Sequence, residues 1–165
     1  MSVKQISKIA EKYFRGSKGT HDWSHAIRVY NTCMHIGRTE NADLEILKLA
    51  SILHDIAHNE QDSSKGKICH AELGAKMAEE ILAQNGYSED KIKQIVHCIL
   101  THRYRKQNTP QTLEAKILYD ADKLDAIGAV GIGRAFLFAG ELGNTLHDPD
   151  IDPKNIKDYS REDTA

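Results

Sequence analysis

The chain has 165 residues, of which 40% are hydrophobic and 28% are charged, as in soluble globular proteins that bury a core without disulfides or a structural metal. Its net charge of −2 gives no electrostatic signature of binding to a nucleic-acid polymer. It contains no apolar run of membrane-spanning length and no signal-peptide pattern, and its three cysteines lack disulfide or zinc spacing. We therefore expect a cytoplasmic protein with reduced thiols and no membrane partner.

Apolar residues recur at helical spacing along most of the chain, and no segment shows the alternation of a strand. The pattern predicts helices over 2–14, 22–37, 43–58, 70–85, 88–102, 112–126 and 134–142. We expect a loop over 59–67 and a loosened helical pattern at the glycines 128, 131 and 133. The prediction is one all-α domain over 1–143, a bundle of six or seven helices, with an irregular or partly disordered tail over 144–165.

Two motifs place histidine and aspartate in apolar surroundings. In SILHDIAHNE, residues 51–60, an apolar run is interrupted by His54, Asp55 and His58, although burying an imidazole beside a carboxylate is unfavourable without partners. In LYDADKLDA, residues 118–126, three aspartates would repel one another on a shared helix face. A bound cation would remove both penalties.

The chemistry of these side chains indicates which cation. Residues four apart share a helix face, so we expect His21 to stack near His25, and His54 near His58. Imidazole and carboxylate together suit first-row divalent metals, and the absence of thiolates at usable spacing disfavours a structural zinc site. The sequence therefore predicts a mixed histidine and aspartate metal site that is assembled from three helices.

Three stretches carry a resemblance to a known family: His25 in HDWSHAIRV, His54 and Asp55 in LHDIAH, and Asp122 in DADKLDAIGAVGIGRAF. In this order, over roughly residues 20–137, they resemble the HD-domain superfamily of metal-dependent phosphohydrolases. The last string is similar to a subgroup of small bacterial and archaeal HD hydrolases. The resemblance implies a helical bundle in which these four residues hold one divalent ion, with Asp125 as the fallback for Asp122. It leaves Mn, Ni, Co, Zn, Fe and Mg open.

The resemblance also suggests further site residues. Several HD proteins bind two ions, and the additional ligands here would be His70 and His102, at the start and end of predicted helices. Some nucleotidases of the family carry a glutamate three residues after the motif aspartate. Here that residue is His58, which we expect to act with Asp55 in catalysis or to support a ligand. His35 and His97 are expected to be packing residues.

Phosphoryl transfer requires positive charge around the phosphate oxygens. The predicted phosphate-binding residues are Lys18, Arg28, Arg103, Lys123 and Arg134. Arg28 is also a candidate to brace an acid near the site. Asp22 and Asp125 are expected to orient the ligand imidazoles or the basic groups.

The leading prediction is a metal-dependent phosphohydrolase that cleaves a phosphate ester or anhydride, with a nucleotide as the preferred substrate and a homodimer as an open question. One alternative is a dinuclear iron oxygenase of the same fold. Another is a nucleotide-binding HD module without catalysis. The zinc-protease pattern HExxH is disfavoured, because Asp55 stands where a longer glutamate must reach the water.

Overall fold

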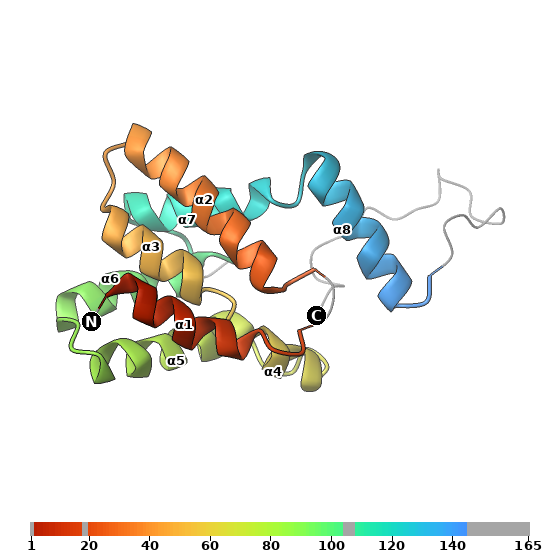
Figure 1. Cartoon of the computed structure of the whole chain (residues 1–165), viewed down its shortest axis with the longest axis horizontal. Coiled ribbons are helices and arrows are strands. Elements are labelled where there is room, and N and C mark those ends of the chain that lie inside the picture. The colour runs from red at the N-terminus through yellow and green to blue at the C-terminus, as the bar shows by residue number, and fades with distance from the viewer. Residues whose placement is uncertain (1, 18–19, 104–107, 145–165) are drawn as a thin grey trace.

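The computed structural model describes residues 2–17, 20–103 and 108–144, and within these ranges the chain forms eight helices. They are α1 (Val3–Tyr13), α2 (Trp23–Thr39), α3 (Leu44–Leu53), α4 (His58–Ser63), α5 (His70–Gln84), α6 (Glu89–Thr101), α7 (Leu113–Leu124) and α8 (Gly128–Glu141) (Figure 1). The prediction of an all-α fold is confirmed. No helix in the described ranges is long and apolar enough to cross a membrane. The tail predicted over 144–165 lies almost wholly outside the described residues.

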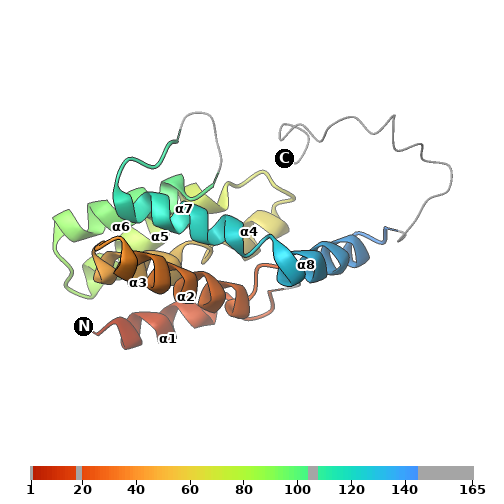
Figure 2. The ribbon, with the colours of Figure 1, turned by 90° about the horizontal axis from the view of Figure 1, so that it is seen from above.

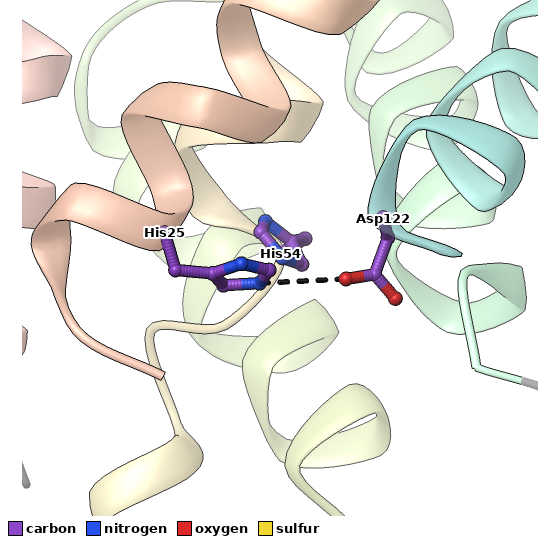
Figure 3. Close-up of side chains that lie close together, drawn as sticks. All are labelled: His25, His54 and Asp122. Carbon is purple, nitrogen blue, oxygen red and sulfur yellow. Dashed lines mark ion pairs between the residues drawn. The ribbon is translucent and has the colours of Figure 1, made fainter. Parts of the chain in front are cut away.

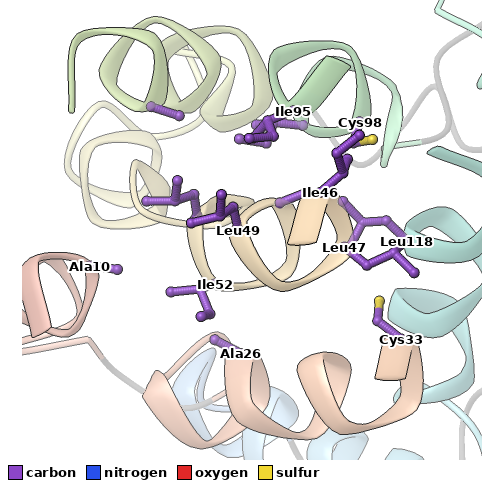
Figure 4. Close-up of a cluster of buried hydrophobic side chains, with 14 of the residues drawn as sticks. Ala10, Ala26, Cys33, Ile46, Leu47, Leu49, Ile52, Ile95, Cys98 and Leu118 are labelled. Carbon is purple, nitrogen blue, oxygen red and sulfur yellow. The ribbon is translucent and has the colours of Figure 1, made fainter. Parts of the chain in front are cut away.

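Helix α3 is the centre of the bundle because it is apolar on nearly every side. It packs against α1, α2, α6 and α7, and most of its side chains are buried. Figure 4 shows it surrounded by side chains from neighbouring helices, including Cys33 of α2 and Cys98 of α6. Both thiols are free and buried, and burial raises the pKa of each to about 12. They are inert packing groups.

The predicted helix over 43–58 is wrong at its C-terminal end. Helix α3 stops at Leu53, a turn follows, and α4 begins at His58 and continues to Ser63, into the segment 59–67 that was expected to be a loop. The turn is closed by the backbone N–H of Ile56, which donates to Leu53 O, and by that of His58, which donates to Asp55 O. In a continuous helix, adjacent side chains diverge by about 100°. The break allows both residues of the histidine–aspartate pair to face one cavity.

The loosening expected at the glycines is also wrong, because α8 begins at Gly128 and runs through Gly131 and Gly133. None of its residues is buried, and seven large apolar side chains from 127 to 142 are exposed. In two perpendicular views α8 extends beyond the other helices (Figures 1 and 2). Its link to the site is Arg134, whose guanidinium reaches Asp125.

Gly131 lies where the chain turns from α7 into α8, and the position has no room for a side chain. A Cβ atom there would lie 2.3 Å from the carbonyl oxygen of Ala126. We expect Gly131→Ala to lower the free energy of unfolding by about 1–3 kcal/mol or to displace the start of α8. Gly133→Ala is the matched control, because its Cβ would meet no atom within 4 Å. Urea unfolding measures the stability of the two variants, and amide exchange measures the protection of α8 in each. Equal stability of the two variants contradicts the prediction.

Candidate metal centre

Six histidine and aspartate side chains converge at one end of the bundle. They come from five segments: His25 from α2, His54 and Asp55 from the end of α3, His70 from the start of α5, His102 from the end of α6, and Asp122 from α7. In one group, the candidate ligand atoms of His25, His54 and Asp122 lie within 4.8 Å of one another (Figure 3). In the second group, the candidate ligand atoms of Asp55, His70 and His102 also lie within 4.8 Å of one another.

Asp55 joins the two groups. Its Oδ2 lies 3.5 Å from Nε2 of His25 and 3.5 Å from Nε2 of His54. Its Oδ1 lies 3.4 Å from Nε2 of His70 and 3.5 Å from Nε2 of His102. One buried carboxylate thus presents one oxygen to each pair of imidazoles, which is the arrangement of a bridging ligand.

All four imidazoles turn the same ring nitrogen towards the centre. Each has an acceptor at Nδ1: Asp125 Oδ2 for His25 (2.7 Å), Ser51 O for His54 (2.7 Å), Gln61 Oε1 for His70 (2.8 Å) and Ile99 O for His102 (2.6 Å). His54 and His102 are the C-cap residues of α3 and α6, and each folds back onto the carbonyl three residues earlier. A proton held at Nδ1 leaves the Nε2 lone pair free for a metal.

The central atoms lack partners of their own. Nε2 of His25 and Nε2 of His54 are buried without a hydrogen-bond partner among the described residues. Nε2 of His70 and Nε2 of His102 lie 3.2 Å apart, although each ring already faces an acceptor at Nδ1. Converging lone pairs beside two carboxylates are unfavourable without a cation, so the donor set fits divalent metal ions.

The pKa values reflect the same electrostatics. Burial lowers the pKa of His54 to about 4 and that of His70 to about 2, so both rings are neutral at pH 7. Burial alone would raise the pKa of Asp55, but the surrounding imidazoles outweigh it and hold that pKa well below its usual value. Burial would likewise lower the pKa of His25, but Asp122 and Asp55 raise it to about 10. Without a metal, a proton on His25 therefore occupies the place that a cation would take.

We expect metal binding to displace this proton. Because the pKa of His25 lies near 10, the ring is protonated at pH 7 in the chelated protein and must become neutral to coordinate an ion. The apparent affinity for the ion should rise about tenfold per pH unit between pH 7 and pH 9, with close to one proton released. Calorimetric titration in buffers of different ionisation enthalpy measures the proton count. An affinity independent of pH contradicts the prediction.

Asp125 supports the site rather than entering it. Besides its bond to the ring of His25, it accepts hydrogen bonds from Arg28 at Nε (2.6 Å) and Nη2 (2.9 Å), and from Nη1 of Arg134 (2.7 Å). Asp125 was predicted to orient ligand imidazoles or basic groups, and in the structure it contacts one imidazole and two guanidinium groups. Asp22 does not touch an imidazole. It caps α2 by accepting the backbone N–H of His25.

A pocket of about 230 Å³ opens beside the two donor groups. It is lined by His21, Asp55, His58, Gln61, His70, His102, Arg103, Asp122 and Lys123. Of the predicted phosphate-binding residues, Arg103 and Lys123 line it, and Lys18 lies outside the described residues. Arg28 and Arg134 are not among its lining residues, because Asp125 binds both guanidinium groups.

His58 lies in the pocket wall, but its neighbours differ from those expected. Its ring stacks on that of His21, with centroids 3.9 Å apart, because the chain leaves the helical path after Leu53 and His58 no longer shares a helix face with His54. His21 itself lies in the turn before α2, with its ring edge-on to His25. Nδ1 of His58 lies 3.4 Å from Oδ2 of Asp62.

Gln61 was not predicted from the sequence, because it lies in a segment interpreted as a loop. A helical spacing of three from His58 was the only signal that could have identified it. Among the remaining histidines, His35 is exposed, so its assignment to packing is wrong. His97 is half-buried, and its Nε2 accepts the backbone N–H of Gln111.

A family model of the HD domain matches residues 22–127, which include all six converging side chains. This chain belongs to the HD-domain family. Family membership confirms the predicted resemblance and makes the chain a member of a superfamily of hydrolases that bind divalent metals.

Several relatives extend the match over most of this HD protein. YpgQ of Bacillus subtilis strain 168, an uncharacterised protein, is 32% identical over 149 residues, which cover 88% of this chain and 70% of YpgQ. A predicted HD-superfamily hydrolase from an uncultured Thermotogales bacterium shares 35% identity with a TM-score of 0.73, over 82% of this chain and 74% of its own. The crystal structure of YpgQ in complex with ADP gives 33% identity and a TM-score of 0.71, over 90% and 73% of the two chains.

Proposed function

We propose that this HD protein is a metal-dependent phosphohydrolase that cleaves a phosphate ester or anhydride of a nucleotide. The observation that carries the proposal is the position of Asp55, whose two oxygens face two separate groups of imidazoles beside a pocket with basic residues in its wall. A cationic site next to basic side chains suits a phosphoryl group, whose charge is spread over its equatorial oxygens.

The proposed ligands of a first ion are His25, His54, Asp55 and Asp122. Asp55 would share a second ion with His70 and His102. When bound, such ions lower the pKa of water and polarise a phosphoryl oxygen. The protein itself prepares the ligands: the Nδ1 acceptors fix the four rings, and burial lowers the pKa of His54 and His70, which keeps both rings neutral and able to donate lone pairs.

The pocket residues would bind the phosphate and move a proton. Arg103 and Lys123 are the proposed phosphate ligands, since both line the pocket. Nζ of Lys123 is held by Oδ2 of Asp122 at 2.7 Å, which keeps its charge beside the donor groups. His58 is the proposed proton-transfer group, with Asp62 favouring a proton on Nδ1 and Nε2 left to exchange one with the substrate.

Two observations favour a nucleotide. YpgQ, the relative with 33% identity, has been crystallised with ADP. The pocket of about 230 Å³ is small for a whole ligand of that size, which suits a phosphate group inside and a nucleoside at the mouth. A cytoplasmic location and a homodimer stay predictions from the sequence.

The dinuclear iron oxygenase remains the second candidate, because the same six donors could hold two irons. Oxygen consumption by iron-loaded protein, with no release of phosphate from any substrate, would favour it. Nucleotide binding without turnover across all metals would favour the regulatory module.

The deciding experiment is a screen of chelated protein reloaded separately with Mn²⁺, Co²⁺, Ni²⁺, Zn²⁺, Fe²⁺ and Mg²⁺. Each form is tested against nucleoside mono-, di- and triphosphates, cyclic nucleotides and small phosphoesters, with release of phosphate or pyrophosphate as the readout. We expect turnover of at least one nucleotide with at least one ion. If no combination of ion and substrate gives turnover, the proposed function is overturned.

A further inference from the structure

Gln61 makes more contacts at the site than its place on the short helix α4 suggests. Its Oε1 lies 2.8 Å from Nδ1 of His70, 3.3 Å from the backbone nitrogen of His70 and 3.1 Å from Nη1 of Arg103. The backbone N–H and the guanidinium can only donate, so the atom that they meet is the carbonyl oxygen of the amide. That oxygen in turn requires His70 to carry its proton at Nδ1.

The four candidate ligand rings are not held equally. His54 and His102 bond to carbonyls of their own helices, and His25 bonds to Asp125, a carboxylate fixed by two arginines. His70 alone depends on a neutral side chain from a different helix. The tautomer of this ring is therefore decided by the position of α4.

Helix α4 is a short element with few anchors. It has six residues, and α5 is the helix against which it makes its principal contacts. A hydrogen bond from Nδ2 of Asn59 to the carbonyl oxygen of Tyr13 also ties it to the end of α1. Because Gln61 lies on this helix, docking of α4 brings its oxygen to His70 and Arg103 together.

We propose that Gln61 is a positioning residue that sets the tautomer of His70 and thereby the affinity of the second metal group, while it holds Arg103 at the edge of the pocket. By accepting the proton of Nδ1, Gln61 keeps Nε2 of His70 unprotonated and facing Oδ1 of Asp55 and the ring of His102. The inference deepens the proposed function, since it rests on an ion at Asp55, His70 and His102.

The first test reads the tautomer without any metal. In chelated protein labelled with ¹⁵N-histidine, long-range ¹H–¹⁵N spectra should show His70 protonated at Nδ1 alone. In Gln61→Leu, which removes the acceptor at similar volume, we expect His70 to gain population of the Nε2–H form. Gln61→Glu keeps an acceptor and should retain the Nδ1–H form. An unchanged His70 tautomer in Gln61→Leu overturns the proposal, whatever the protein hydrolyses.

The second test is a calorimetric titration with Mn²⁺ alone. Wild-type protein should bind two ions, and Gln61→Leu should weaken the ion of lower affinity by about 10–100-fold while leaving the other unchanged. Gln61→Glu should restore it. Gln84→Leu, an exposed glutamine on α5, is the matched control and should bind as the wild type. Equal weakening of both ions in Gln61→Leu shows a general structural role and overturns the inference. Binding of only one ion by the wild-type protein would contradict the dinuclear site. In that case the tautomer measurement on His70 decides whether Gln61 is a positioning residue.

Discussion

Asp55→Asn is expected to reduce phosphohydrolase turnover by on the order of 10³-fold or more and to prevent stoichiometric loading of two ions. Asparagine has nearly the same volume, so the fold is retained, but it carries no negative charge. It also offers one oxygen and one NH₂ group, whereas Asp55 presents an oxygen to each pair of imidazoles. At least one donor group then faces an N–H where an ion requires a lone pair.

The control for this variant lies on α7. Asp120→Asn removes an exposed carboxylate two residues from Asp122, and we expect it to keep full turnover and full metal content. Phosphate release and elemental analysis of the purified proteins are the two measurements. Turnover of Asp55→Asn at the level of Asp120→Asn would contradict the proposed mechanism.

Removal of the metal is expected to give the largest change in stability. Chelation leaves buried lone pairs and two carboxylates converging without a cation, and only the proton on His25 compensates in part. An ion present at 100 to 1,000 times its dissociation constant stabilises the fold by about 3–4 kcal/mol. For a chain of this size, that corresponds to a fall of about 5–15 °C in melting temperature on chelation.

The stability experiment compares untreated, chelated and Mn²⁺-reloaded protein by scanning calorimetry at pH 7. Reloading should restore the midpoint, and Asp55→Asn should show a much smaller difference between the chelated and reloaded forms. The pH gives a second check. The raised pKa of His25 stabilises the chelated fold fully below about pH 6.5, and this stabilisation is lost as the pH rises through about 10. Equal midpoints with and without metal would contradict the site.

Part of the site could be predicted because residue chemistry and spacing already conflict with simple packing. His54 and Asp55 stand in an apolar run, and Asp122 stands between two other acids, so a cation was the economical explanation. His70 and His102 were predicted from the family resemblance and from their places at helix ends, and the structure brings both to Asp55. The basic residues were harder, since charge alone does not show whether an arginine faces the pocket or, like Arg28, an acid.

The errors in the fold have a common physical origin. Helical periodicity continues through residues 54–58, and nothing local signals that α3 stops at Leu53. The stop is accompanied by two features that periodicity does not reveal: the ring of His54 bonds to Ser51 O three residues earlier, and α4 docks beside α5. Likewise, three glycines favour a loop, but the close approach of Gly131 to Ala126 makes one of them a requirement of the helix start.

The sequence by itself determined the all-α class, the motif order and most of the groups proposed to bind a cation, because these depend on composition, periodicity and the intrinsic chemistry of side chains. Only the tertiary structure decided that Asp55 faces two groups rather than one, that Gln61 joins the site, and that Arg28 and Arg134 hold Asp125. These features depend on where helices end and how they cross, which brings together residues that are distant along the chain.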